Sequence, residues 1–196
     1  MAFTAFVSTY APHRCGIATF TSDLASSVGP HQVVALHPVS GPAAYPSVVR
    51  HRIRRDSRGD YLAAAAALNA SDVEVVSIQH EYGIWGGEDG AYVLDFVRAL
   101  DVPVVTTLHT VLRTPTPSQQ RILTALVGMS ATTVVMSRSA STLLMQAYGV
   151  EPGRVRVVPH GVPRLPLVDP DTIKPHLDLE GRLVILSFGL LGPGKG

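Results

Sequence analysis

The sequence Val73-Glu-Val-Val-Ser-Ile-Gln-His-Glu-Tyr-Gly-Ile-Trp-Gly-Gly-Glu-Asp-Gly90 holds the pattern that decides the fold. Residues 73–79 form a mostly apolar run rich in valine and isoleucine, which is typical of a strand buried on both faces. Residues 80–90 form a loop with four glycines and a His-Glu pair. In doubly wound sheets ligands bind at the carboxyl ends of the strands, so this loop is a candidate site.

Apolar runs of this kind alternate with helical segments along the whole chain. Strands are predicted over 3–8, 32–36, 47–53, 73–79, 103–108, 132–136, 155–158 and 183–188. Helices are predicted over 17–28, 61–69, 91–100, 118–127 and 140–148, the last with Ser139 as its N-cap and Gly149 closing it. This order predicts an α/β fold, a doubly wound, mostly parallel Rossmann-like sheet with helices on both faces.

Three segments are expected along the chain. Residues 1–158 form the Rossmann-like domain, and residues 159–182 form a linker because their five prolines break regular helices and central strands. Residues 183–196 then start a second α/β unit. Its loop, Gly189 to Lys195, matches the GxxxxGK pattern of nucleotide-binding P-loops, although Gly196 stands where a P-loop has Ser or Thr. A P-loop-like nucleotide hydrolase is therefore one alternative.

The composition restricts the class of protein. The 196 residues are 46% hydrophobic and 16% charged, which indicates a compact globular protein with a sizeable core. A formal net charge of +1 gives no global attraction to nucleic acid, so no nucleic-acid partner is predicted. The single cysteine excludes an intrachain disulfide, and no leader or apolar run of about 18 residues is visible. The expected location is cytoplasmic.

Polar residues follow several of the predicted strands. His80 with Glu81, His109 and His160 each come directly after an apolar run, and should share one edge of the sheet. Their spacing fits no metal motif, so no metal or cofactor is predicted. Contact with a hydroxylated or phosphorylated ligand is favoured instead.

Glycines near these residues point to the same edge. Gly16 opens a helix after the first strand, beside Cys15, and allows a ligand to approach the backbone closely. Gly86 and Gly87 belong to the loop after residue 79. The alternative is structural, with turn glycines that relieve crowding and Trp85 as a packing plug.

Five arginines occupy nine residues in the segment 50–58: Arg50, Arg52, Arg54, Arg55 and Arg58. Such a cluster either protects a solvated edge strand by charge or makes weak contact with an anionic membrane surface. Both interpretations stay open.

Five motifs, taken in order, resemble the N-terminal half of GT-B glycosyltransferases of the retaining family 4. They are Cys15-Gly-Ile-Ala-Thr-Phe-Thr, Gln79-His-Glu-Tyr-Gly-Ile-Trp-Gly-Gly, Thr107-Leu-His-Thr, Val158-Pro-His-Gly-Val and Ser187-Phe-Gly-Leu-Leu-Gly-Pro-Gly-Lys-Gly. The resemblance implies sugar transfer from a nucleotide-sugar donor to a sugar or glycolipid acceptor, with retention of configuration and without a catalytic metal. The acceptor would bind mostly to the first domain and the donor mostly to the second.

The resemblance also implies roles for particular residues. His109 would lie at the reacting sugar as the catalytic residue, Lys195 would contact the donor diphosphate, and Gly16 would line the cleft. The other residues expected to bind substrate are Cys15, His80, Glu81, Gly86, Gly87 and His160.

Two positions depart from the family pattern. Cys15 stands where relatives often have a second glycine, and Leu190 stands where they often have an arginine. Leu190 motivates the second alternative, a non-catalytic sugar- or nucleotide-binding module. Because the donor would bind mostly to the second domain, residues 1–196 alone are expected to be inactive.

Overall fold

The computed structural model describes residues 1–37, 44–162 and 165–187. The chain divides into two compact units, Met1–His160 and Gly161–Gly196. The first unit contains the sheet and all the predicted site residues except Lys195, and it is the unit in which the site is built.

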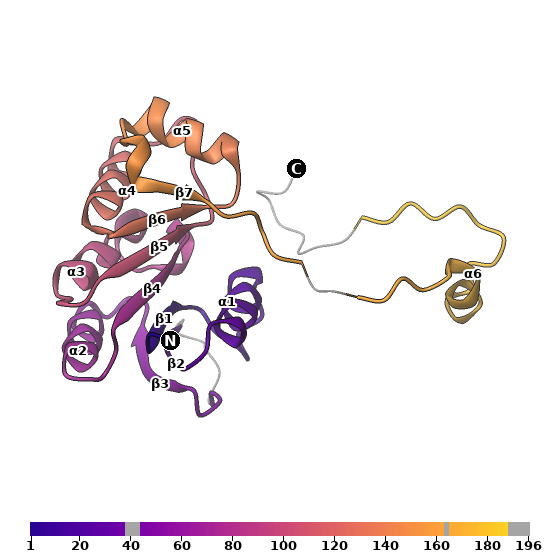
Figure 1. The fold of residues 1–196 in the computed structure, drawn as a ribbon, viewed down its shortest axis with the longest axis horizontal. Coiled ribbons are helices and arrows are strands. Elements are labelled where there is room, and N and C mark those ends of the chain that lie inside the picture. The colour runs from indigo at the N-terminus through magenta and orange to yellow at the C-terminus, as the bar shows by residue number, and fades with distance from the viewer. Residues whose placement is uncertain (38–43, 163–164, 188–196) are drawn as a thin grey trace. The chain divides into compact units, whose positions relative to one another are not determined.

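The first unit is organised around one seven-stranded sheet in the order β3-β2-β1-β4-β5-β6-β7 (Figure 1). Every neighbouring pair is parallel, as the unalternated apolar runs predicted. The strands are β1 (Thr4–Ser8), β2 (His31–His37), β3 (Val49–Arg54), β4 (Val75–His80), β5 (Val104–Leu108), β6 (Thr132–Val135) and β7 (Val155–Val157).

Helices cover both faces of this sheet, which confirms the predicted doubly wound α/β fold (Figure 1). They are α1 (Gly16–Ser27), α2 (Arg58–Asn69), α3 (Tyr92–Arg98), α4 (Pro117–Met129) and α5 (Arg138–Tyr148), with short 3-10 helices η1 (Tyr82–Ile84), η2 (Glu88–Gly90) and η3 (Pro152–Arg154). On the face of α1, Ala25 packs with Phe6 and Val33 in a small cluster.

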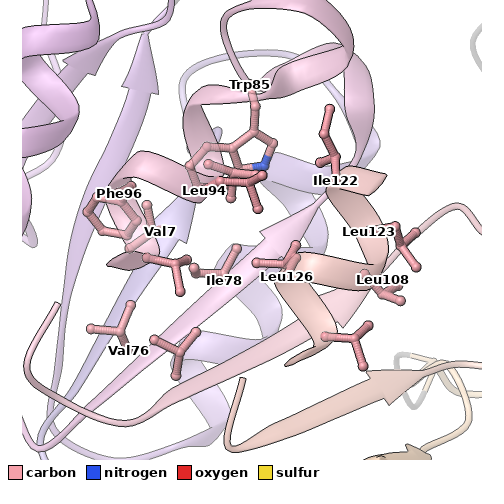
Figure 2. Close-up of a cluster of buried hydrophobic side chains, with 14 of the residues drawn as sticks. Val7, Val76, Ile78, Trp85, Leu94, Phe96, Leu108, Ile122, Leu123 and Leu126 are labelled. Atoms are coloured by element: carbon pink, nitrogen blue, oxygen red, sulfur yellow. The ribbon is translucent and has the colours of Figure 1, made fainter. Parts of the chain in front are cut away.

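The larger core lies on the opposite face of the sheet, under α2 to α5. Figure 2 shows part of this core, in which Leu94 and Phe96 of α3 and Leu126 of α4 share one buried cluster with the strand side chains Val76 and Ile78. Each such side chain stabilises the fold by about 1.5–3 kcal/mol when fully buried. Because successive side chains of a strand point to opposite faces, the residues buried in this core leave their neighbours in each strand on the face of α1.

Helix ends follow the sequence with one correction. Gly149 closes α5 in the left-handed conformation, with φ of 66°, as predicted. The N-cap is Ser137 and not Ser139, because the Ser137 hydroxyl accepts a hydrogen bond from the Ala140 N–H and the helix starts at Arg138. The prediction of Ser139 was wrong because it placed the helix two residues too late.

The second unit contains no strand among its described residues, so the predicted strand over 183–188 is wrong as far as residue 187. Leu183 and Ile185 are each 92% exposed. A β-strand needs a neighbour for its backbone hydrogen bonds, and the described part of this unit offers none. Gly189, Leu190 and Lys195 lie outside the described residues.

The proline-rich segment is also more helical than predicted. It contains a short helix, α6 (Pro170–Ile173), followed by the 3-10 helix η4 (Lys174–Leu177). Pro170 is tolerated because it lies at the first helical position, where its missing N–H would have no partner within the helix. Within the described ranges, no helix has both the length and the apolar character needed to cross a bilayer.

Candidate active site

The strand order places the candidate site at the carboxyl ends of β1 and β4. The order in which strands are added to the sheet reverses between these two strands. β2 and β3 lie on one side of β1, and β4 to β7 lie on the other. In open α/β sheets a crevice for ligands forms at this switch point. The loops that leave β1 and β4 therefore border the candidate site.

The loop after β1 ends at the N-terminus of α1. Cys15 is the N-cap, and its thiol accepts a hydrogen bond from the Ala18 N–H with an N···Sγ distance of 3.3 Å. The Thr9 hydroxyl lies 3.1 Å from the same sulfur. Cys15 thus fills a position usually held by Ser, Thr, Asp or Asn, and it orients the start of the helix.

Gly16 is exposed, and nothing in the described structure requires a glycine there. A Cβ built at Gly16 would meet no atom within 4 Å, and its φ does not lie in the left-handed region. The first N–H groups of a helix have no partner within the helix, and they point outward with the positive end of the helix dipole. Gly16 therefore leaves this backbone open to a ligand, and the crowding alternative finds no support.

His109 lies beside α1 at the end of β5. Its Nε2 is 2.9 Å from Oε1 of Gln79, a fully buried residue of β4, so the imidazole donates this hydrogen bond. Phe20 of α1 packs its ring at 89° to the His109 ring, with centroids 4.8 Å apart, and contacts the His160 ring at 5.2 Å. The structure therefore brings His109 and His160 together around one aromatic side chain.

Burial determines the charge of His109. Burial lowers its pKa to about 4, and the nearby His160 adds a smaller effect in the same direction. At neutral pH the imidazole is uncharged, with the proton on Nε2 held by Gln79. Its Nδ1 then carries a lone pair that can accept a hydrogen bond from a ligand hydroxyl.

His80 does not share this surface. Side chains alternate along a strand, and His80 points to the same face as Ile78, into the larger core, where it is 0% exposed. Its ring contacts that of Tyr82, with centroids 5.0 Å apart, and within the described structure neither ring nitrogen has a hydrogen-bond partner. Burial lowers the pKa of His80 to about 4, and His109 adds to this shift. Only its backbone joins the site, where its carbonyl accepts the His109 N–H.

Glu81 lies at the same edge. Its carboxylate accepts a hydrogen bond from the Thr110 hydroxyl, which joins the loop after β4 to the loop after β5. Glu81 is half-buried and has no basic partner among the described ion pairs. Its carboxylate remains able to accept further hydrogen bonds from a ligand.

The glycine loop after β4 has mainly structural reasons for its composition. Trp85 is 2% exposed, belongs to the core, and donates its indole N–H to the Gln79 carbonyl at 3.1 Å. Gly86 is buried, and a Cβ there would lie 1.8 Å from the carbonyl oxygen of Arg55. Gly87 is exposed with φ of +80°, a conformation that favours glycine. The interpretation of Trp85 as a packing plug thus describes the structure.

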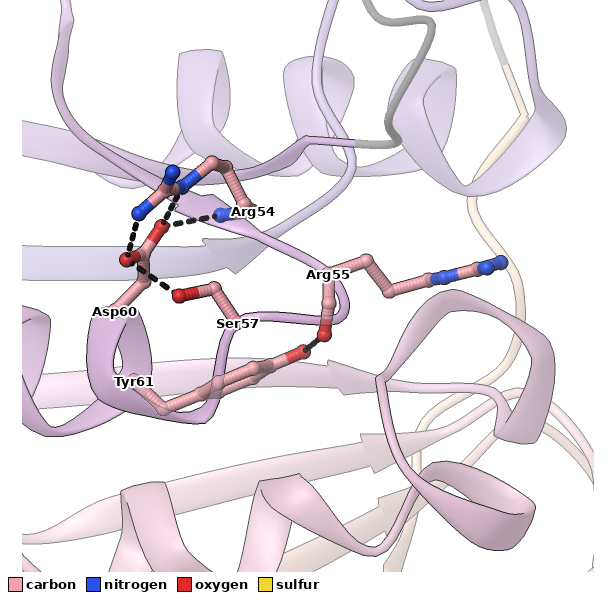
Figure 3. A network of polar contacts seen from close by, with 5 residues as sticks. All are labelled: Arg54, Arg55, Ser57, Asp60 and Tyr61. Carbon is pink, nitrogen blue, oxygen red and sulfur yellow. Dashed lines mark hydrogen bonds and ion pairs between the residues drawn. The ribbon is translucent and has the colours of Figure 1, made fainter.

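Three of the five clustered arginines are held by carboxylates. Arg54 binds Asp60 through Nε at 2.8 Å and Nη2 at 2.9 Å, and this hydrogen bonding holds the pKa of Asp60 well below its usual range (Figure 3). Arg55 pairs with Asp56 and Arg58 with Asp95. Arg50 and Arg52, exposed on β3, form no ion pair within the described residues.

Sequence reasoning missed two residues that hold His109 in place. Gln79 carries a detectable signal, since it is a polar residue inside an otherwise apolar run directly before His80. Phe20 carries a weaker one, because it follows Gly16 by four residues and therefore lies one helical turn further along the same face. No group of three or more His, Cys, Asp or Glu side chains in the described ranges is arranged to hold a metal ion.

Comparison with known structures identifies the class of fold. The chain is similar to a glycosyltransferase from Rickettsia africae ESF-5, with 15% identity and a TM-score of 0.59 over 90% of this chain and 49% of that one. It is also similar to HepE from Anabaena, solved in complex with UDP-glucose, with 13% identity and a TM-score of 0.66 over 98% of this chain and 54% of that one. The fold is the Rossmann-like half of a GT-B glycosyltransferase. The chain spans about half the length of these two structures.

The sequence itself establishes the family. Residues 13–164 match Glycosyltransferase Family 4, and the chain belongs to that family. No curated protein gives a significant match.

Proposed function

We propose that the chain forms the acceptor-side domain of an enzyme that transfers a sugar from a nucleoside-diphosphate donor, with retention of configuration. In this reaction the bond from the anomeric carbon to a diphosphate oxygen breaks and a bond to an acceptor hydroxyl oxygen forms. The hydroxyl proton leaves with the diphosphate. The acceptor is a sugar or a glycolipid.

The arrangement of His109 is the observation that carries this proposal. A neutral imidazole whose Nε2 proton is held by Gln79 can accept a hydrogen bond at Nδ1 from a sugar hydroxyl, but it is not a proton donor at neutral pH. Retaining transfer from a diphosphate donor depends on leaving-group stabilisation more than on a strong acid or base. We assign His109 to the positioning of the reacting sugar.

The N-terminus of α1 supports an anionic ligand at the same edge. Gly16 is exposed at the first position of this helix, and a phosphate group at a helix N-terminus gains from both hydrogen bonds and the helix dipole. We propose that this backbone faces the donor, while Lys195 supplies a cation to the diphosphate.

The remaining predicted residues receive separate roles. Glu81 and His160 are proposed to contact substrate hydroxyls, and Gly87 to border the acceptor. For the buried His80 and Gly86 we propose that they position the loops rather than touch substrate. Cytoplasmic action, expected from the single cysteine, stays part of the proposal.

The proposal is tested with two chains: residues 1–196, and a chain that continues past Gly196 into a second α/β domain. Both are incubated with a panel of sugar nucleotides and sugar or glycolipid acceptors, and product configuration is read by proton NMR. The longer chain should transfer sugar with retention, and residues 1–196 alone should not. In the longer chain His109→Gln should lower kcat/KM at least about tenfold, which corresponds to the loss of about one hydrogen bond. Asp72→Asn should not, because Asp72 is exposed just before the amino end of β4, away from the carboxyl ends of the strands.

Two results would contradict the proposal. Inverted product would remove the retaining assignment, and robust transfer by residues 1–196 would remove the two-domain assignment. Tight sugar-nucleotide binding by the longer chain without turnover would favour the non-catalytic module, which the replacement of the usual arginine by Leu190 motivates.

A further inference from the structure

A cavity of about 350 Å³ lies beside the candidate active site, at the carboxyl ends of β3 and β4. Its polar walls are Arg55 and Asp56 after β3 and Asp89 after β4, and its aromatic walls are Tyr82 and Trp85. Backbone of three glycines completes the lining. The volume lies near the lower end of the about 300–1,000 Å³ that small-molecule sites occupy, so the cavity is suited to a ligand of one or two rings.

The two loops that form the cavity are fixed to each other by Tyr61. Its hydroxyl donates a hydrogen bond to the Arg55 carbonyl at 2.8 Å (Figure 3). The same hydroxyl accepts a hydrogen bond from the Gly86 N–H at 2.9 Å. Burial raises the pKa of Tyr61 to about 12, so the hydroxyl keeps its proton. The close approach of Gly86 to the Arg55 carbonyl follows from this junction, and the cavity is therefore largely pre-formed.

Asp89 is held in an unusual backbone conformation with its carboxylate fixed. Its φ is 52°, and the left-handed region costs a non-glycine residue about 1–2 kcal/mol. The Gln119 amide donates to its carboxylate at 3.3 Å, and the Gln119 carbonyl accepts from the Tyr82 hydroxyl at 3.5 Å. Gln119 also completes the capping box that starts α4, so the end of a thirteen-residue helix positions two walls of the cavity.

The charges that line the cavity favour a neutral ligand. Asp56 and Asp89 supply two carboxylates and Arg55 supplies one guanidinium, which gives a formal charge of −1. Arg55 is itself bonded to Asp56, through Nε at 3.1 Å and Nη2 at 3.2 Å. A phosphate group would meet two like charges and a cation that is already paired. Sugar hydroxyls, which both donate and accept, match the carboxylates, the guanidinium and the exposed backbone.

We propose that this cavity binds a neutral, hydroxyl-rich sugar unit of the acceptor. This proposal rests on the proposed function, because the acceptor is identified by its place next to the reaction site. Tyr82 links the two places, since it lines the cavity and its ring packs on His80, whose carbonyl accepts the His109 N–H. Asp89 and Asp56 accept hydrogen bonds from the sugar, while the half-buried ring of Tyr82 borders its apolar face.

The single tryptophan of the chain provides the measurement. Trp85 borders the cavity, so titration of residues 1–196 with neutral mono- and disaccharides should change its fluorescence in a saturable way. Asp89→Asn keeps the size and the tolerance for the left-handed region but removes the charge. It should weaken sugar binding at least about tenfold, as expected for loss of a hydrogen bond to a charged group. Asp72→Asn, the same change on an exposed residue before β4, should leave binding unchanged.

Several outcomes would overturn the assignment. They are the absence of a saturable response to any saccharide, equal binding by Asp89→Asn and the original chain, or tighter binding of inorganic phosphate than of sugars. The proposed function can be judged separately. Transfer by a longer chain that is insensitive to Asp89→Asn would remove the acceptor site and leave the function. Sugar binding that depends on Asp89, together with no transfer by that longer chain, would remove the function and leave the cavity as a sugar-binding site.

Discussion

Gly16 and Gly86 differ in the space that each leaves for a side chain. A methyl group at Gly86 would lie 1.8 Å from the Arg55 carbonyl oxygen, whereas one at Gly16 would lie in open space. Gly86→Ala should therefore lower the free energy of unfolding by about 2 kcal/mol or more, because backbone must move to admit it. Gly16→Ala should change it by less than about 0.5 kcal/mol. Urea denaturation of both variants tests this contrast, and equal destabilisation would refute it.

His80 gives a pH dependence that can be predicted with its sign. Its folded pKa is about 4 and that of an exposed histidine is about 6.5, so between these values only the unfolded imidazole binds a proton. His80 therefore has no effect on the free energy of unfolding above about pH 6.5, and it lowers that free energy as the pH falls toward 4. From pH 7 to pH 5 the original chain should lose about 1–2 kcal/mol more than His80→Met, in which this titration is removed. Parallel urea curves at the two pH values would show it, and identical losses would contradict it.

At the scale of the element, the N-cap of α5 offers a matched pair of serines. Ser137→Ala should cost about 1 kcal/mol, because the Ala140 N–H loses the hydroxyl that it donates to. Ser139→Ala should have almost no effect, since this residue lies within the helix and is exposed. Chemical denaturation distinguishes the two, and a larger loss for Ser139→Ala would mean that the helix begins where the sequence suggested.

The elements that sequence reasoning predicted well are those with a local signal. Mostly apolar runs rich in valine, such as the predicted 73–79 and 103–108, identify the strands β4 and β5, because strands buried on both faces are rich in such residues. The run 183–187 has the same composition and forms no strand, since pairing depends on a neighbour that is not encoded locally. Local sequence therefore predicts the ability to form a strand, but not the partner.

The sequence predicts where the candidate site lies, but it does not predict which side chains contact one another there. Strand ends predicted that His109 and His160 would meet at one edge, since parallel strands all end there. The direction of the His80 side chain depends on strand register, which a shift of one residue reverses. The clamp of Gln119 on Asp89 joins residues thirty positions apart and has no local signature.

At the scale of the whole molecule, the sheet, its switch point and the family define the Rossmann-like half of a glycosyltransferase. We propose that its reaction site lies at the carboxyl ends of the strands, where His109, Gln79 and the start of α1 meet. The proposed position of the donor depends on His109, Gln79 and the start of α1 together. The Nδ1 of a neutral His109 can accept a hydrogen bond from a sugar hydroxyl, and the start of α1 favours an anion.

The structure of a chain that continues past Gly196, solved with a bound sugar nucleotide, would show directly where the donor lies. We predict the donor diphosphate facing the N-terminus of α1 at Gly16 and a sugar hydroxyl about 3 Å from Nδ1 of His109. A donor bound away from the carboxyl ends of β1, β4 and β5, with His109 out of hydrogen-bond reach of the sugar, would contradict the account.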